Sequence, residues 1–405
     1  MSGALEHIRV LDMTIWQQGT SASVMLADLG ADVIKIEEPT KGDPGRRLLF
    51  LPKVGLSGYF EALNRGKRSL ALDLKHPKGR QVLLRLARDA DVFLTNFRPG
   101  VAERLGIGYR ELSEANPRII FARASGYGRE GPDAQAGSFD ILGQARSGLM
   151  AVTGDRDGPP SSVGAPIADQ VGGMMAAFGI LAALLHREQT GQGQEVDVSL
   201  LGSAMALQSF NITSYLFSGD LPARGGAMGF SPFWNLYRGS DGRYLALGML
   251  QDRRWPEICE AIGQPELEHD ERFASRSGRL VDHRQELIAI LEEAFAQRPA
   301  DEWLRRLSER GVFCARVQDY EELSHDPQVI ANGYIVEVER PDGPPVRMVA
   351  TPIQLSKTPV NIRGLAPELG QHTEEVLIEA GHSREEIDAL RSEGVIGPKH
   401  EPKAN

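Results

Sequence analysis

The sequence predicts an α/β protein with a large Rossmann-like domain, built on a parallel sheet, and a smaller α+β domain. Two observations lead to this fold class. Strand and helix patterns alternate through the first hundred residues, as in a parallel sheet with helices on both faces. A glycine-containing stretch at 219–229 then separates this region from a second set of short strands and helices.

In the large domain, apolar patterns predict the elements in order. Strands are expected at 7–13, 32–37, 69–72, 91–96, 118–125 and 195–200, and helices at 22–29 and 77–90. A long apolar helix begins near Asp169 and stops at the turn residues 190–194. Loop 14–19, after the first strand, has no G-x-G-x-x-G, so a nicotinamide or flavin dinucleotide is poorly supported.

A helix over 203–217 is expected to lead out of the large domain. The smaller domain then holds strands at 234–238 and 244–249 and helices at 253–261, 283–296 and 300–310. Beyond it we expect a strand at 333–338, a hairpin turn at 341–345 and a helix near 373–380. The polar tail from 397 is expected to fray.

Composition is that of an ordinary globular protein, with 405 residues, 41% of them hydrophobic and 25% charged, which is enough for two domains. No leader precedes the first strand, and the longest apolar run, 171–185, is shorter than the roughly 20 residues that span a bilayer. A cytoplasmic protein without a membrane partner is therefore expected. Cys259 and Cys314 lie far apart, and the nine histidines show no metal-ligand spacing, so neither a disulfide nor a metal site is predicted.

Charge is unevenly distributed along the chain. The net charge of −10 argues against nucleic acid as a partner. Residues 35–110, however, hold 16 Lys and Arg against 8 Asp and Glu, which would attract a polyanionic small molecule. For Arg80, Arg85 and Arg88, the alternative to binding a ligand is that they line the solvent-exposed face of helix 77–90.

Asp169 is a lone carboxylate at the front of a strongly apolar helix. We expect Val171, Met174, Met175, Phe178, Leu181, Ala182 and Leu185 to form its buried face. A helix N-terminus favours an anion, so Asp169 is expected to stay ionised well below neutral pH. Two interpretations follow: Asp169 only caps the helix, or it is a nucleophile.

Several ordered motifs run nearly from end to end of the chain. They are IRVLD at 8–12, LADLGADVIKIE at 26–37, NRGKRSLALD at 64–73, NFRPG at 96–100, GAPIADQ at 164–170 and GILAAL at 179–184. Together they resemble the class III CoA-transferase family (CaiB/BaiF type), which includes formyl-CoA transferase, carnitine CoA-transferases and α-methylacyl-CoA racemases. The resemblance implies that the C-terminal segment returns to the large domain and that two chains interlock as linked rings in a homodimer. The expected domains are 1–202, a linker at 203–224, 225–325, and a returning part at 326–405.

In this family a carboxylate attacks an acyl-CoA thioester, and CoA then passes through a covalent intermediate to a second acid. The resemblance makes Asp169 that nucleophile, coenzyme A the co-substrate and a metal unnecessary. By position, the implied CoA contacts are Gln17, Gln18, Leu72, Asp73, Leu74, Lys75, Asn96, Phe97, Arg98, Arg104, Phe139 and Asp140. Tyr59, Gly225 and Gly226 match substrate positions less closely. For Leu72 and Phe97, ordinary core packing stays an open alternative.

Three departures from the family pattern carry information. Glu38 stands where formyl-CoA transferase has a basic residue and Gly137 where it has a lysine, so part of the nucleotide-binding contacts must differ. Phe139 stands where the racemases have a histidine that works with the aspartate as a two-base pair. A phenylalanine cannot move a proton, which disfavours racemisation. A CoA-ester-binding protein without chemistry is the remaining alternative.

Overall fold

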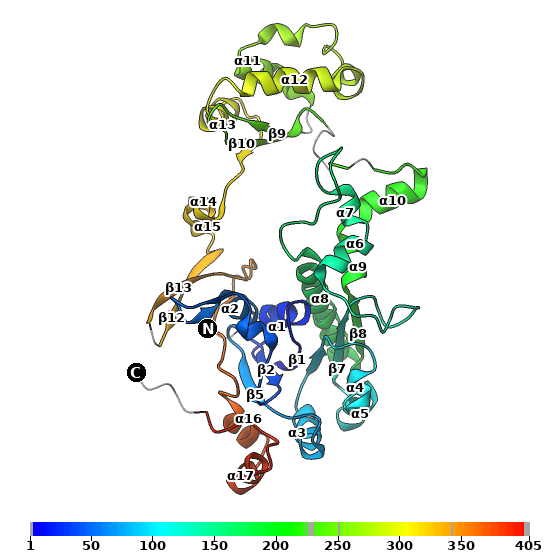
Figure 1. The fold of residues 1–405 in the computed structure, drawn as a ribbon, viewed down its shortest axis with the longest axis vertical. Coiled ribbons are helices and arrows are strands. Elements are labelled where there is room, and N and C mark those ends of the chain that lie inside the picture. Colours follow the sequence, from blue (N-terminus) through cyan, green and yellow to red (C-terminus); the bar gives the residue numbers. More distant parts are fainter. Residues whose placement is uncertain (1–2, 223, 226–230, 250–251, 342, 401–405) are drawn as a thin grey trace. The chain divides into compact units, whose positions relative to one another are not determined.

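The computed structural model describes residues 3–222, 224–225, 231–249, 252–341 and 343–400 (Figure 1). The chain divides into two compact units. The first comprises Met1–Leu149, Ser162–Thr213 and Ile330–Asn405, and the second Met150–Ser161 and Ser214–Val329. Segment Met150–Ser161 groups with the second unit, although the predicted boundaries place it in the large domain.

A parallel six-stranded sheet forms the centre of the first unit, which confirms the predicted fold class. Its order is β5 (Arg68–Ala71), β2 (Asp32–Glu37), β1 (Arg9–Met13), β6 (Val92–Thr95), β7 (Ile120–Ser125) and β8 (Glu195–Ser199). All neighbouring strands are parallel. The chain reverses its direction of travel across the sheet between β1 and β6, so the two halves of the sheet meet there.

Two layers of helices cover this sheet. On one face α1 (Gln18–Asp28) and α8 (Ile167–Thr190) share a core with the strands. On the other face lie α3 (Pro77–Ala87), α5 (Tyr109–Ala115), α16 (Thr373–Glu379) and α17 (Arg384–Ser392). The C-terminal helices belong to this layer because Asp73 N donates to Val395 O at 2.8 Å and Leu72 bridges to Ile396.

Shorter elements complete the first unit. They are α2 (Gly58–Asn64), α4 (Val101–Arg104), α6 (Asp140–Arg146), α9 (Leu200–Leu207), the pair β3 (Phe50–Leu51) and β4 (Leu56–Ser57), and the hairpin β12 (Ile335–Arg340) and β13 (Gly343–Val349). Helices α7 (Leu149–Val152), α10 (Ser209–Ser218) and α15 (Pro327–Ala331) lie where one unit passes into the other. The single predicted helix over 203–217 is wrong, since α9 and α10 divide that stretch.

The second unit is a small α+β structure. Its antiparallel sheet has the order β11 (Cys314–Arg316), β10 (Tyr244–Gly248) and β9 (Trp234–Arg238). Helices α11 (Trp255–Ile262), α12 (Arg284–Phe295) and α13 (Ala300–Ser308) pack on it, and α14 (Tyr320–His325) follows. In its core the rings of Tyr237 and Phe295 stack, and Trp303 meets Phe295 in a T-shaped contact. This core is separate from the cores of the first unit.

The predicted buried face of α8 is wrong. Met174, Met175, Phe178 and Leu185 are exposed, and the buried residues are mostly small: Ala168, Gly172, Gly173, Ala176, Ala177, Ile180, Ala183, Leu184 and Arg187. Small side chains face inward because α8 packs closely on α1, which leaves no room for large ones. Apolar spacing alone could not choose between these two faces.

Helix α8 is also longer than the apolar run suggested. It has 24 residues, ends at Gly191 with a φ of 74°, and is, within the described residues, the one helix long and apolar enough to cross a membrane. The expectation that this run is too short for a span is therefore wrong. Length and composition are weak evidence for a membrane, since a core helix meets the same criterion.

Candidate active site

Helices α1 and α8 both begin at the edge of the sheet where the parallel strands end. Helix α1 follows β1, and α8 leads into the parallel β8, so both run opposite to the strands. The space beyond β1 and β6 is the topological switch point, where doubly wound sheets bind ligands. Asn96 joins the two loops there: its Oδ1 accepts from Ile15 N at 3.0 Å and its Nδ2 donates to Ile15 O at 2.5 Å.

The first turn of α1 lies against the second turn of α8 through two glycines. A Cβ atom at Gly173 would lie 2.5 Å from Ser21 Cβ and 2.9 Å from the Gln18 carbonyl oxygen. A Cβ atom at Gly172 would lie 2.8 Å from Gln18 Nε2. Asp169 is one helical turn before these glycines, on the same face of α8. The helix packing therefore holds Asp169 beside the beginning of α1.

Asp140, and not Asp169, accepts the free N–H groups at the start of α8. Its Oδ1 accepts from Ala168 N at 2.7 Å and from Asp169 N at 3.1 Å. Its Oδ2 accepts from Gln144 Nε2 at 2.6 Å. Asp169 is the third residue of α8 and makes no side-chain cap. The interpretation of Asp169 as only a helix cap is therefore wrong, because another carboxylate does that work.

The environment of Asp169 overturns the expected low pKa. Burial, followed by the negative charge of Asp140, raises the pKa of Asp169 to about 7. The helix N-terminus would favour the anion, but its N–H groups already serve Asp140. A desolvated carboxylate with a pKa near neutrality is a better nucleophile than a solvated one and is still partly ionised at pH 7.

Tyr59 and Phe139 border the same region. Burial raises the pKa of the Tyr59 hydroxyl, and the nearby charges of Asp169 and Asp43 raise it further. The Phe139 ring is 62% exposed and meets the edge of the Trp16 ring, with centroids 6.3 Å apart. The structure thus gathers Tyr59, Phe139 and Asp140 around Asp169.

Gln17 and Gln18 form the beginning of α1. Gln17 is the N-cap residue and provides no side-chain hydrogen bond to the helix. Gln18 is 5% exposed, and its Nε2 has no hydrogen-bond partner within the part of the chain that the structure describes. The backbone N–H groups of Gln18 and Gly19 also have no acceptor among the described residues. Free donors thus lie beside Asp169.

The remaining predicted CoA contacts follow β5 and β6 at the same edge. Leu72 and Leu74 are buried in the core, so any ligand contact there must come from backbone. Asp73 Oδ1 accepts from Lys75 N at 2.9 Å, and the Lys75 side chain is exposed. Phe97 packs partly on the core.

Two arginines stand free near the end of β6. A Cβ at Gly137 would lie 2.6 Å from an Arg98 terminal nitrogen, and one at Gly100 would lie 3.0 Å from Arg104 Nη1. Both arginine side chains are exposed, and neither has a carboxylate partner in the described ranges. Arg98 therefore occupies the space that the missing side chain of residue 137 leaves.

The second predicted substrate segment lies in the other unit. Gly225 has a φ of 109° and its N–H donates to Val152 O at 3.3 Å. Gly226 lies outside the described residues. The role of this segment stays a prediction.

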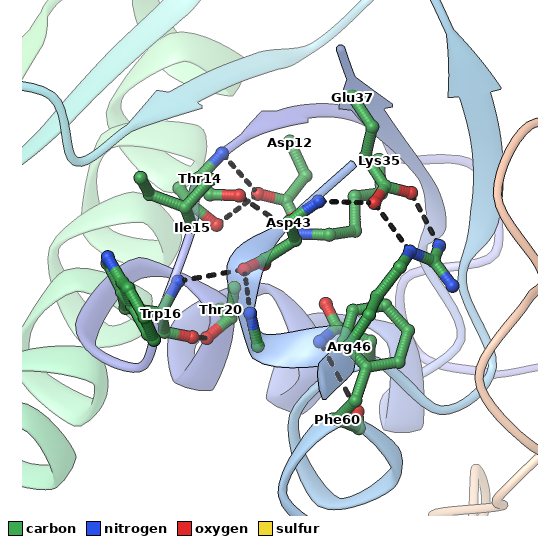
Figure 2. A network of polar contacts seen from close by, with 12 residues as sticks. Asp12, Thr14, Ile15, Trp16, Thr20, Lys35, Glu37, Asp43, Arg46 and Phe60 are labelled. Carbon is green, nitrogen blue, oxygen red and sulfur yellow. Dashed lines mark hydrogen bonds and ion pairs between the residues drawn. The ribbon is translucent and has the colours of Figure 1, made fainter. Parts of the chain in front are cut away.

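Sequence reasoning missed a network of buried charges behind the site. Figure 2 shows Asp12, Lys35, Asp43 and Glu37 grouped under loop 14–16, with Arg46 at one side. Lys35 and Glu37 lie within the motif at 26–37, which assigns neither of them a separate role. A lysine inside an otherwise apolar strand was the available signal, because lysine is almost never fully buried unless it is paired.

Comparison with known proteins now identifies the family. A family model described as CoA-transferase family III matches residues 5–373. The chain belongs to CoA-transferase family III. The chain is 34% identical to the succinyl-CoA–D-citramalate CoA-transferase of Chloroflexus aurantiacus, over 97% of this chain and 98% of that one. It is 37% identical to the formyl-CoA:oxalate CoA-transferase of Streptomyces coelicolor, over 97% and 99%.

A solved structure extends the likeness to the fold of this CoA-transferase. A CaiB/BaiF family protein from Brucella suis matches with a TM-score of 0.84 and 31% identity, covering 94% of this chain and 100% of that one. The protein is an enzyme, a class III CoA-transferase that acts between acyl-CoA and acid substrates. Among the described residues no group of three or more His, Cys, Asp or Glu could hold a metal ion.

Proposed function

We propose that the enzyme moves CoA from an acyl-CoA to a carboxylic acid through covalent intermediates on Asp169. The observation that carries this proposal is the state of Asp169. It is a desolvated carboxylate with a pKa of about 7, relieved of the capping role by Asp140, beside the free N–H groups of α1. These are the properties of an activated carboxylate nucleophile.

The proposed reaction has four balanced steps. Asp169 attacks the thioester carbonyl, and the CoA thiolate leaves a mixed anhydride of Asp169 and the acyl group. The thiolate then attacks the aspartyl carbonyl of the anhydride, which releases the donor acid as a carboxylate and leaves an Asp169–CoA thioester. The acceptor carboxylate repeats these two steps in reverse. No proton, metal or redox partner is consumed.

Each step passes through a tetrahedral oxyanion, which needs fixed donors. The free N–H groups in the first turn of α1 lie beside Asp169 and support this role. The amide of Gln18 supports it as well, since a buried donor without an acceptor costs about 1–3 kcal/mol until a ligand supplies one. We propose that the α1 N-terminus binds the oxyanions formed on Asp169.

Racemisation of 2-methylacyl-CoA is the less favoured function. It needs two bases that flank the α-carbon. Phe139 precedes Asp140 at the start of α6, and its phenyl ring cannot accept a proton. A protein that only binds CoA esters is also disfavoured, because it would gain nothing from an ionisable group buried at a cost.

Coenzyme A would lie along the carboxyl edge of the sheet. Arg98 and Arg104, which have no carboxylate partner within the described part of the chain, present guanidinium groups there that suit phosphate oxygens. Arg98 would supply the cation that Gly137 lacks. The substrates of the two relatives, succinyl-CoA with D-citramalate and formyl-CoA with oxalate, suggest a small carboxylic acid as acceptor.

An exposed apolar face supports a homodimer. Met174, Met175, Phe178 and Leu185 are each at least 40% exposed along one side of α8. Contiguous apolar surface of this kind usually marks an interface. We propose that a second copy of the chain covers it, in the interlocked form that the family resemblance implies.

A scan of acyl-CoA donors against carboxylate acceptors tests the proposed activity. Purified enzyme is incubated with each pair, and the new acyl-CoA is identified by mass spectrometry. Transfer by wild type and not by Asp169→Ala is the expected result. Equal transfer by both proteins would remove Asp169 from the mechanism.

A further inference from the structure

Loop 14–16, between β1 and α1, is irregular, yet side chains hold almost all of its backbone. Thr14 N donates to Asp12 Oδ1 at 3.1 Å, and Thr14 O accepts from Lys35 Nζ at 2.8 Å. Both backbone groups of Ile15 bond to Asn96, as described above. Trp16 N donates to Asp43 Oδ1 at 3.3 Å, and Trp16 O accepts from the Thr20 hydroxyl. The loop is therefore fixed by the protein interior.

Lys35 and Asp43 form the centre of this support (Figure 2). Lys35 Nζ lies 2.9 Å from Asp43 Oδ2, and both side chains are at most 1% exposed. The backbone N–H of Asp43 donates to Glu37 Oε1 at 3.0 Å, and Arg46 binds Glu37 through two nitrogens, at 2.8 and 2.6 Å. The pair thus supports the loop from β2, the strand next to β1, and from the turn that follows β2.

The pair carries full charges in a buried place. Burial by itself lowers the pKa of Lys35, but the carboxylates of Asp12, Asp43 and Glu37 outweigh it and hold the pKa above its usual value. An apolar pair of similar size often stabilises a fold as well as a buried ion pair does. Stability alone does not explain why these charges meet under a loop.

What the pair holds is a strained conformation. Trp16 has a φ of 61°, which a non-glycine residue adopts only when its surroundings impose it. Trp16 directly precedes Gln17 and the free N–H groups of α1. If the loop relaxed, these donors would lose their direction toward Asp169.

We propose that the buried Lys35–Asp43 pair is a positioning device that presets loop 14–16, so that the first turn of α1 faces Asp169 before substrate binds. This inference rests on the proposed function for its effect on rate. Its structural part, the fixing of the loop, does not. Lys35 and Asp43 act through the loop and touch no substrate.

A second buried pair offers a matched control. Arg65 and Asp28 are 2.6 Å apart with side chains 6% and 1% exposed, and Asp28 lies at the opposite end of α1. We compare Lys35→Met/Asp43→Asn with Arg65→Met/Asp28→Asn, since each replaces a buried pair by neutral groups of similar size. Both variants are expected to unfold at a lower temperature than wild type.

Hydrogen exchange measures the local opening of loop 14–16 in the absence of substrate. In Lys35→Met/Asp43→Asn the amides of residues 14–16 should exchange at least about tenfold faster than in wild type, because their local opening becomes easier. In the control variant they should exchange as in wild type. Wild-type exchange in the Lys35 variant, or equal acceleration in both variants, would overturn the inference.

The effect of the pair on catalysis is measured as the rate at which hydroxylamine captures Asp169 in the presence of acyl-CoA. At saturating acyl-CoA the Lys35 variant should form the hydroxamate at least about tenfold more slowly, with the half-saturating concentration changed less than about threefold, since misplaced donors act on the rate. The control should stay within about twofold of wild type, as distant sites act independently. An equal rate in the Lys35 variant contradicts the inference. The absence of hydroxamate in wild type would instead contradict the proposed function.

Should the Lys35 double variant not fold, Asp43→Asn alone takes its place. Lys35 then still faces Asp12 and Glu37 and keeps its bond to Thr14 O. Faster exchange at residues 14–16 is still expected, and wild-type exchange there would overturn the inference.

Discussion

Asp169 and Asp140 are two carboxylates at the start of one helix with different tasks. Asp140 accepts two N–H groups of α8 and is held by Gln144, so its charge is well compensated. Asp169 has no such donors among the residues that the structure describes, and burial together with the charge of Asp140 raises its pKa to about 7. The environment, and not the residue type, separates the structural acid from the reactive one.

The rate of transfer should therefore depend on pH through Asp169. Only the ionised carboxylate attacks, so kcat/KM should rise with pH and reach half its plateau near pH 7. Asp140→Asn keeps an acceptor oxygen for α8 but removes the like charge, so the midpoint should move to lower pH. A pH profile of both proteins measures this. An unchanged midpoint in Asp140→Asn would show that Asp140 does not raise the pKa of Asp169.

Phe139 leads to a second prediction for a single residue. Since no base other than Asp169 is assigned to the α-carbon, (R)-2-methylacyl-CoA incubated with enzyme in deuterated water should gain no α-deuterium, as read by mass spectrometry. A racemase of this family incubated in parallel serves as control. Rapid exchange by the present enzyme would restore the isomerase function.

Residue types were easier to predict than residue states. The motif at 164–170 pointed to Asp169, but the expected low pKa was wrong, because the acceptor at the helix start comes from Asp140, 29 residues earlier. The Lys35–Asp43 pair was missed for a similar reason. Lys35 belongs to β2 and Asp43 caps the 3₁₀ turn at 44–47, and no local sequence pattern joins these two residues.

At the scale of elements, the contact between α1 and α8 decides the geometry of the site. The buried side of α8 is lined with glycine and alanine, which lets the two helices approach until backbone meets backbone. The site is thus built by two rigid helix ends rather than by a flexible loop, which favours precise placement.

Gly173→Ala should test this contact. The added methyl would lie 2.9 Å from the Gln18 carbonyl oxygen and 3.1 Å from Ala22 N, so the helices must separate. We expect a loss of about 1–3 kcal/mol in the free energy of unfolding, despite the better helix propensity of alanine, together with slower transfer. Chemical denaturation and steady-state kinetics measure the two effects.

Gly179→Ala on the same helix is the matched control. Its methyl would meet only Val196 Cγ1, at 2.8 Å, and the Val196 side chain can shift to make room. It should cost less stability than Gly173→Ala and leave transfer near wild type. An equal loss of transfer in both variants would contradict the importance of the α1–α8 contact.

Strands and the longer helices were predictable because their apolar patterns are long and bounded by turns. Strand β2 was predicted at its exact limits, whereas the start of α1 was placed four residues too late, at Ala22 rather than Gln18. The missed residues, from Gln18 to Ser21, are polar or glycine and are buried, with Gln18 and Ser21 against α8. Long-range packing makes them helical, and periodicity does not reveal that.

At the scale of the whole molecule, the order of the six strands places nearly all of the candidate site in the first unit. The loops after β1, β5 and β6 and the start of α8 meet at one edge of one sheet. The parallel sheet could be inferred from strand and helix alternation. The assignment of 150–161 to the second unit could not, because these residues carry no pattern that separates them from the loop before α8.

The oligomeric state gives a prediction at this scale. Light scattering should report roughly twice the chain mass of 44.3 kDa, because a second copy would cover the apolar face of α8. Phe178→Asp, a charge on the most exposed residue of that face of α8, should weaken the dimer. Lys75→Asp, just before α3 on the other face of the sheet, should not. A wild-type monomer at micromolar concentration would contradict the interlocked dimer.

Removal of metal ions is a separate test. EDTA should leave the transfer activity unchanged, because no step of the proposed mechanism uses a metal.

The proposed covalent role of Asp169 can be tested by trapping its intermediates. Wild-type enzyme is incubated with its acyl-CoA donor and hydroxylamine and then digested. The mass of the peptide containing residues 164–170 is measured by mass spectrometry. We expect a hydroxamate on Asp169 in wild type and none in Asp169→Asn, whose amide is a weak nucleophile but whose fold and CoA affinity should be retained. A folded Asp169→Asn variant with wild-type turnover, or a wild-type peptide left unmodified during turnover, would contradict the covalent role of Asp169.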